Sequence, residues 1–315
     1  MIDFRYHLVS LIAVFLAIAL GIVIGTTQLN GKVLDDLRGQ VSSLEQDKRD
    51  LEDNTQQLKT QQDNSEAFTT AVAPALVGGS LTGRSVALVI TDDQVSSDTV
   101  DEVTALIGQA GGTVSGTIRL TPAYSDPSKA SALENYVTGG GLPTSVTLPT
   151  NGDAGQLVAS VLAQVLMAKV AGPAPTTADL SSVLAGLTSL EVLSADSASV
   201  TPANFAVVLT AGAFKGADAD ERNAALAELA AALDAAGEGA VVAGNTVSAG
   251  DQGLVGVVRN DPATSAAVST VDNVDTIAGQ ISAVLALGSE RDGTSGKYGT
   301  GQDTQPVPPV PAATQ

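Results

Sequence analysis

Two adjacent carboxylates, Asp92 and Asp93, come closest among the residues of this chain to a recognisable binding site. They follow the apolar run 85–91 (SVALVIT), which predicts a buried strand. Carboxylates at the end of a strand can hold Mg²⁺ or Ca²⁺ together with waters and a backbone carbonyl. The same pair also suits an acidic loop ahead of a helix start, and we favour that interpretation over a metal site.

A second loop offers a partner for the first. The apolar run 205–210 is followed by small residues and by Lys215. If both runs lie in one parallel sheet, their carboxyl ends meet at one edge, where open α/β sheets bind ligands. The two loops would then border a small ligand site, an interpretation that we rank below a pair of plain loops.

Composition excludes most other chemistry. The 315 residues include no Cys, and His7 is the single imidazole, so thiolate chemistry and multi-His metal sites are excluded. Neither GxGxxG nor GxxxxGK[ST] occurs. The 34 acidic against 15 basic residues give a net charge of -19, which repels nucleic acids. We therefore expect a protein that is not an enzyme, with no catalytic residues, no resident cofactor and no nucleic-acid partner.

The elements that would position these loops form an α/β domain over residues 80–288. Short β-branched runs alternate with amphipathic helical segments, which indicates βαβ units and a mostly parallel sheet. The sequence predicts a Rossmann-like domain without a nucleotide fingerprint. Its predicted strands are 85–91, 113–120, 205–210, 239–243 and 254–259. Its predicted helices are 97–110, 128–137, 157–170, 178–187, 219–236 and 274–287.

An uncharged apolar run near the N-terminus predicts a transmembrane helix over residues 8–27, after a short segment 1–7. The core of the run, residues 8–24, has about 17 residues, or roughly 26 Å of helix, near the lower limit for crossing a bilayer. A cleaved signal peptide and a buried soluble helix are the alternatives. We favour an uncleaved anchor because the run continues past the possible cleavage site Ala17-Ile18-Ala19. The basic residues on the two sides of the run barely discriminate between the two orientations in the membrane. A short N-terminal segment with Arg5 is more common on the cytoplasmic side, which places the C-terminal domain outside the cytoplasm.

Residues 29–70 predict a coiled-coil stalk. Leucines recur at d positions over four heptads, which is typical of a parallel two-stranded coiled coil and predicts a homodimer. Polar residues at most a positions make this coil weak by itself, and a single amphipathic helix on its own domain is the alternative. The helix is expected to end before Pro74. The dimerisation residues that we predict are Leu34, Leu37, Val41, Leu44, Leu51 and Leu58.

The last segment, residues 289–315, is rich in Gly, Thr, Gln and Pro and has no apolar periodicity. Such composition predicts a disordered tail with polyproline character. Its Pro-rich end could dock on a partner, but a solvated tail is the interpretation that we favour.

The N-terminal stretch combines Arg5, His7 and the run Val9-Ser10-Leu11, and continues through Ala13-Val14-Phe15-Leu16-Ala17 to Gly21 and Gly25. Together with the stalk and with the unit that begins Gly83-Arg84-Ser85 and ends at Gly112, it resembles the actinobacterial MctB family. That family is known for copper transport in the mycobacterial envelope and includes SteB, a corynebacterial partner in cell separation. The resemblance implies a cell-membrane protein with a SteA-like envelope partner, or one in the outer membrane as the family's description has it. No catalytic or ligand residue is carried over from it.

Only this resemblance suggests that the protein has a role in copper transport. Cu(I) prefers Cys and Met, and Cu(II) prefers imidazole. Met1, Met167 and His7 are the only such side chains, so one chain cannot assemble a high-affinity copper cage. We therefore expect a dimeric, membrane-anchored scaffold for an envelope or cell-separation partner. A copper-efflux component and a ligand-sensing α/β domain are the alternatives.

Overall fold

The structure is a computed structural model that describes residues 3–195 and 200–310. The chain divides into two compact units, Met1–Ser65 and Glu66–Gln315. The first unit is entirely helical where it is described, and the second holds a sheet between two helical layers.

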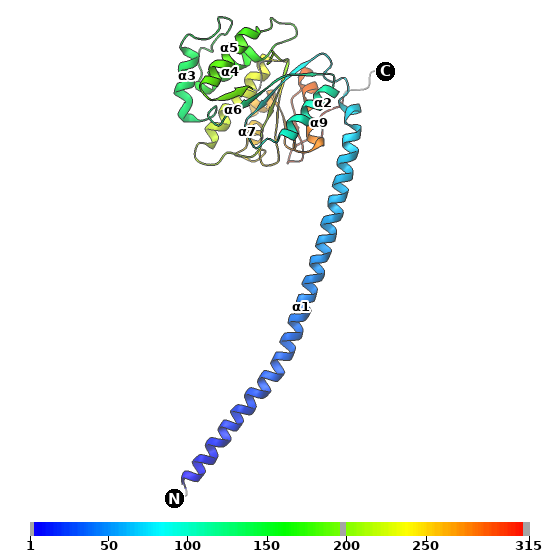
Figure 1. Cartoon of the computed structure of the whole chain (residues 1–315), viewed down its shortest axis with the longest axis vertical. Helices are drawn as coiled ribbons and strands as arrows, with labels where there is room; N and C mark the ends of the chain where they lie inside the picture. The colour runs from blue at the N-terminus through cyan, green and yellow to red at the C-terminus, as the bar shows by residue number, and fades with distance from the viewer. Residues whose placement is uncertain (1–2, 196–199, 311–315) are drawn as a thin grey trace. The chain divides into compact units, whose positions relative to one another are not determined.

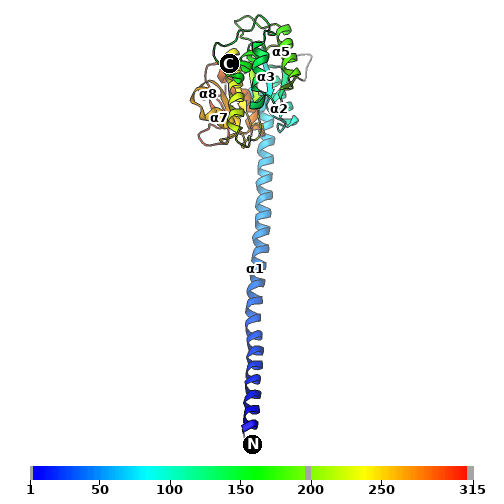
Figure 2. The same cartoon turned by 90° about the vertical axis from the view of Figure 1, so that its left-hand side faces the viewer.

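Helix α1, Asp3–Val77, is the longest element and is continuous in both views (Figures 1 and 2). The prediction that this helix ends before Pro74 is wrong, since Pro74 lies inside its last turn. The turn persists because Ala73 and Val77 are buried in the core of the second unit and the Pro74 carbonyl accepts a hydrogen bond from Gly78 N at 3.1 Å. The helix ends at Val77, and Gly79 in the turn that follows has a φ of +81°, which suits glycine.

Among the described residues the sheet has seven strands in the order β3-β2-β1-β4-β5-β6-β7. All neighbouring pairs are parallel except β2 with β3, which are antiparallel. The mostly parallel mixed α/β sheet that the sequence predicts is thus confirmed. The strands are β1 (Ser85–Ile90), β2 (Thr113–Leu120), β3 (Leu193–Ala195), β4 (Phe205–Leu209), β5 (Ala240–Ala243), β6 (Ser269–Val271) and β7 (Lys297–Tyr298).

Helices cover both faces of the sheet, as parallel strands require. Helices α2 (Ser97–Gln109) and α9 (Ile277–Arg291) lie on one face together with the last turns of α1 (Figure 1). The opposite face carries α3 (Ala130–Thr138), α4 (Ala154–Leu166), α5 (Thr177–Ser189), α6 (Ala219–Ala236), α7 (Leu254–Asn260) and α8 (Pro262–Ala267). The strands are therefore apolar on both sides: Val86, Leu88 and Ile90 face the first core, whereas Ala87 and Val89 face the second.

Side-chain caps set where several helices begin. Ser96, which the sequence singles out as a cap, accepts a hydrogen bond from Thr99 N at 3.1 Å at the start of α2. Asp153 does the same for α4, and Thr276 for α9. Each cap satisfies a backbone N–H that has no partner within the helix.

One predicted strand is a helix. Residues 254–259 (LVGVVR) form most of α7, in which Leu254, Val255 and Val258 are buried. A short apolar run that is buried has the same composition in a strand and in a helix. The strand that pairs with β5 in the sheet is β6. It has three residues (Ser269–Val271), and it is too short and too polar for the sequence to indicate a strand.

The predicted disordered tail is also wrong, as far as residue 310. Helix α9 continues to Arg291, and β7 then pairs with β6 through the register Val271↔Tyr298. Tyr298 is only 2% exposed, and burial of its ring offsets the entropy of ordering a Gly-rich segment. Residues 311–315, the end of the Pro-rich stretch, lie outside the described residues.

Candidate functional site

The carboxyl ends of the parallel strands share one edge of the sheet, which we call the carboxyl edge. The chain leaves β1 for β2 on one side and later returns to β4 on the other side of β1. Open parallel sheets bind ligands where the strand order reverses in this way. The gap between the ends of β1 and β4 is therefore the first place to look for a site.

Asp92 lies in this gap. Its Oδ2 accepts a hydrogen bond from Ala211 N at 2.9 Å, and its Oδ1 accepts one from Gln94 N at 2.9 Å. The carboxylate thus joins the loop after β1 to the loop after β4, and its two oxygens serve the protein's own N–H groups. Asp93 is exposed and takes no part in this network.

The two loops that the sequence places together do meet, but they leave little space. The cavity between them has a volume of about 40 Å³ and is lined mainly by Asp92, Gln94 and residues 210–214. The Gln94 amide lies 3.1 Å from the place where a side chain on Gly212 would begin, and Lys215 is exposed outside the lining. This volume suits one or two waters, whereas small-molecule sites are about 300 Å³ or larger.

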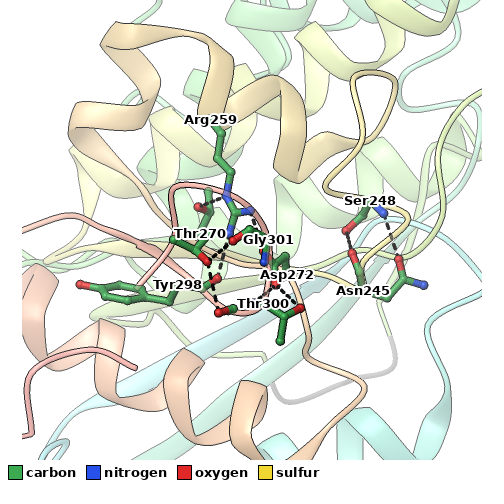
Figure 3. Close-up of polar contacts among 10 residues, drawn as sticks. Asn245, Ser248, Arg259, Thr270, Asp272, Tyr298, Thr300 and Gly301 are labelled. Carbon is green, nitrogen blue, oxygen red and sulfur yellow. Dashed lines mark hydrogen bonds and ion pairs between the residues drawn. The ribbon is translucent and has the colours of Figure 1, made fainter. Parts of the chain in front are cut away.

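A second network lies at the ends of β6 and β7 (Figure 3). The Arg259 guanidinium donates to Oδ2 of Asp272 at 2.7 Å, to the Thr270 hydroxyl at 2.9 Å and to the Tyr298 carbonyl at 2.8 Å. Asp272 also accepts from Thr300 N at 2.8 Å and from Gly301 N at 3.0 Å. The ion pair therefore attaches the segment after β7 to the rest of the sheet.

Asp272 is only 1% exposed, and the Arg259 side chain is 10% exposed. Burial would raise the pKa of Asp272, but the hydrogen bonds from Arg259, Thr300 and Gly301 outweigh it and hold that pKa below its usual range. The pair stays ionised and fully engaged at neutral pH. The Arg259–Asp272 ion pair is therefore structural, and we call it the clasp. Neither of its two side chains has a free group for catalysis.

Sequence reasoning missed this clasp. Arg259 was placed at the end of a strand, and Asp272 lay between predicted elements. The available signal is weak: Asp272 follows the short run Ser269-Thr270-Val271 and precedes other polar residues.

The loop after β5 closes the interval between these two networks (Figure 3). Asn245 Oδ1 accepts from Gly212 N at 3.3 Å and from Ser248 N at 3.0 Å, and the Ser248 hydroxyl donates to the Asn245 carbonyl at 2.6 Å. From β1 to β6, Asp92, Asn245, Arg259 and Asp272 at the carboxyl edge are thus paired with groups of the protein itself, whereas Asp93 and Lys215 are exposed. This part of the edge is built to be closed.

Two carboxylates, the buried Glu290 and the half-buried Asp234, lie at the opposite edge. Glu290 Oε1 accepts from Ser269 N at 2.7 Å, and Asp234 Oδ1 accepts from Ala240 N at 3.0 Å, each at the amino end of a strand. Burial, with a contribution from the charge of Asp234, raises the pKa of Glu290 to about 7. Glu290 is therefore a group whose charge changes near neutral pH.

Helix α1 carries the remaining features that the sequence singles out. Among the described residues one helix is long and apolar enough to cross a membrane, Arg5–Gly25, with a mean hydropathy of 2.9. Phe15 and Leu16 are each 64% exposed, so this segment is not a core helix. It fits a single-pass membrane anchor.

The predicted dimerisation residues lie farther along the same helix. Leu44 and Leu51 are each 67% exposed, and Leu37, Val41 and Leu58 are also exposed. The side chain of Leu34 lies outside the described residues. These apolar side chains are therefore exposed in the single chain. That a second copy covers them stays a prediction.

The candidate copper ligands are divided between the two units, and Met1 lies outside the described residues. Met167 is buried in the core of the second unit, whereas His7 lies on the apolar segment in the first. Over the described ranges 3–195 and 200–310, no group of three or more His, Cys, Asp or Glu residues could hold a metal ion. Asp92 and Asp93 accordingly form no such group.

Comparisons with known proteins cover nearly the whole chain. The family described as "Copper transport outer membrane protein, MctB" matches residues 1–309. Proteins named "Copper transporter MctB" from Mycobacterium tuberculosis and Mycobacterium bovis are each 33% identical over 312 residues, which is 98% of this chain and 99% of theirs. The Mycobacterium leprae protein of the same name is 33% identical over 309 residues, covering 96% of this chain and 97% of its own. The resemblance first noted at the N-terminus is confirmed for the full length.

Proposed function

The chain belongs to the MctB family, and on this premise we propose that it serves copper homeostasis as a membrane-anchored dimeric scaffold of the cell envelope. In this proposal the apolar segment of α1 stays in the membrane uncleaved, and the following part pairs with a second copy. The α/β domain, of Rossmann-like ancestry, lies outside the cytoplasm and presents its surface to an envelope partner.

One observation carries this proposal: the anchor and the exposed leucine row lie on the same helix. Anchoring confines two chains to one membrane plane and aligns their helices in parallel, which raises the effective concentration for pairing. Polar a positions such as Lys48 and Thr55 make the coiled coil too weak to keep two free chains paired in solution. The same coiled coil is then strong enough to keep two anchored chains paired. The pairing of polar groups at the carboxyl edge from β1 to β6 supports a role in assembly over one in catalysis.

The second candidate is a component that moves or hands on copper. The names of the mycobacterial relatives favour it. Among the described residues the first unit holds the imidazole and the second holds the thioether, so within either unit copper would have to contact groups supplied from elsewhere. The third candidate is a ligand-sensing α/β domain, and the cavity of about 40 Å³ disfavours a ligand at the sheet's reversal point.

Deletion of the gene in its own organism separates the first two candidates. Loss of a scaffold predicts chained, unseparated cells whose copper tolerance is unchanged or only slightly lower. Loss of a transport component predicts growth arrest at copper concentrations that the parent tolerates, with normal separation. Complementation with His7→Ala is the matched test: full rescue of copper tolerance is expected for the scaffold, and loss of rescue would favour transport through this chain.

A further inference from the structure

A pocket at the end of β2 is left unused by everything described above. It lies between the loop after β2 and helices α4 and α6, on the carboxyl edge, and has a volume of about 280 Å³. Apolar side chains including Leu133 and Ala225 line part of it. Four acidic residues line the rest: Asp126, Asp153, Glu221 and Glu228. We call this cavity the acidic pocket.

Two of the carboxylates are held together without a cation. Glu228 Oε1 accepts a hydrogen bond from the Gln156 amide at 3.1 Å, and no donor among the described residues reaches Oε2. That Oε2 and the Asp153 Oδ1 lie 2.7 and 3.2 Å from the position that a Gly155 Cβ would occupy, so both reach the same side of Gly155. Burial raises the pKa of Glu228, and the charge of Asp153 adds to the rise.

The nearby guanidinium, that of Arg222, is engaged elsewhere. Arg222 donates to the Pro122 carbonyl at 2.9 Å, pairs with Asp218 and lies over the Phe214 ring. Hydrogen bonds from Ser128, with smaller contributions from the charges of Arg222 and Lys129, lower the pKa of Asp126 and not that of Glu228. The Asp153–Glu228 end of the pocket therefore keeps uncompensated negative charge.

A buried phenol supplies an independent sign of a ligand. Tyr124 lines the pocket and is only 4% exposed, and its hydroxyl has no hydrogen-bond partner among the described residues. Burial raises the pKa of this phenol and the charge of Glu228 raises it further, so the hydroxyl is neutral and close to that carboxylate. Buried polar groups of proteins are nearly always hydrogen-bonded. A buried hydroxyl without a hydrogen-bond partner beside a charged pocket therefore indicates a binding site.

We propose that the acidic pocket binds the ammonium or guanidinium end of an organic cation, with Glu228 and Asp153 facing the charge, Tyr124 at the floor and the apolar lining around a hydrocarbon stem. A bare metal ion fits less well, because no three acidic groups over the described ranges converge for one and the volume is far larger than an ion requires. The cation is either a free aliphatic amine or the basic side chain of a partner protein.

Titration calorimetry of the full chain in detergent micelles tests this, with the heat for empty micelles subtracted. Pentylammonium is expected to bind with a dissociation constant of about 1 mM or tighter, and neutral 1-pentanol at least about tenfold more weakly. An acetyl-Gly-Lys-Gly-amide peptide separates the sources. Binding of both probes indicates a partner's basic side chain, whereas binding of pentylammonium alone indicates a free amine.

Three variants make the result specific. Glu228→Gln is expected to weaken pentylammonium binding about tenfold, whereas Glu134→Gln, on the exposed side of α3, leaves it unchanged. Tyr124→Phe is expected to weaken it at least about threefold without lowering the melting temperature, because an unpartnered hydroxyl contributes nothing to folding. Equal binding by Glu228→Gln and Glu134→Gln, equal affinity for pentanol, or no binding of either cationic probe would overturn the proposal. If Glu228→Gln does not fold, unchanged binding by Tyr124→Phe would overturn it alone.

Discussion

At the scale of single residues, the polar groups at the carboxyl edge include pairs that join residues far apart in the sequence. Arg259 and Asp272 belong to a helix and a strand end, and they fasten a segment that follows both. A buried ion pair contributes little net stability over an apolar pair, but removal of one partner is costly because it leaves the other charge buried. The clasp therefore determines where the C-terminal segment lies more than how stable the domain is.

Replacement of Asp272 tests this account. Asp272→Asn leaves the Arg259 charge uncompensated in a site where the carboxylate was 1% exposed, and should lower the free energy of unfolding by about 3 kcal/mol. Denaturant unfolding followed by circular dichroism measures it. Asp292→Asn is the matched control, because its pair with Arg291 is 68% exposed on the Asp side, and its effect should be below about 0.5 kcal/mol. Equal effects of the two substitutions would contradict the clasp.

Glu290 gives the domain a dependence on pH. Its pKa of about 7 in the folded chain exceeds that of an unfolded glutamate, so its stabilising contribution is fully present in acid and is lost as the pH rises through 7. Between pH 5.5 and 8.5 this group alone should lower the free energy of unfolding by roughly 2 kcal/mol.

Glu290→Gln should remove that part of the pH dependence and keep the acceptor for Ser269 N. The measurement is the difference between wild type and variant in unfolding experiments at the two pH values. A difference that does not change with pH would show that Glu290 does not titrate in this range.

At the scale of elements, one continuous helix, α1, contains both segments that the sequence predicts as anchor and stalk. The chain has no Cys, which allows a direct test of pairing. A Cys at the d position Leu51 should form a disulfide between two copies in membranes, because facing d positions of a parallel in-register pair are close together. Non-reducing gel electrophoresis after mild oxidation detects it.

The control for pairing lies on the outer side of the same helix. Gln46 occupies an f position in this register, so Gln46→Cys should cross-link far less than Leu51→Cys. Equal yields at both positions would show random collision and not a coiled coil. Cross-linking of neither would leave α1 a single helix, the alternative that the sequence allows.

At the scale of the whole molecule, the proposed function requires the α/β domain to lie outside the cytoplasm. Val247 is 57% exposed on that domain, and Asp3 precedes the anchor. In intact cells a membrane-impermeant maleimide should label Val247→Cys and leave Asp3→Cys unlabelled until lysis. The reverse pattern would place the domain in the cytosol and exclude the envelope-scaffold proposal.

Sequence patterns predicted the parts of the fold that depend on near neighbours. Helix α6 matches its expected range, β2 does as well, and the ends of β1 and β4 differ by one residue from the prediction. Helical and strand periodicity are local properties of the chain, and parallel strands buried on both faces have clear apolar runs. The loops after β1 and β4 do meet, because parallel strand ends share an edge, although the sequence favours plain loops over a ligand site between them.

The errors arose where a distant contact overrides local composition. Residues 254–259 are a helix because β6 occupies the place beside β5, and residues 297–298 are a strand because the Tyr298 ring is buried and Arg259 holds the Tyr298 carbonyl. The acidic pocket was not foreseen either, because its lining comes from segments between residues 124 and 228 with no common motif.

By itself, then, the order of residues determined that the chain has an apolar span, a helix with a leucine row and an alternating α/β domain, because each follows from hydrophobic periodicity along one element. Only the tertiary structure decided which polar groups are paired and which remain open. Asp92 and Asp272 look equally available in the sequence, yet Oδ2 of Asp92 and both oxygens of Asp272 accept hydrogen bonds from backbone N–H groups of residues far along the chain. The availability of a polar side chain depends on what packs against it, and those neighbours lie from tens to more than a hundred positions away.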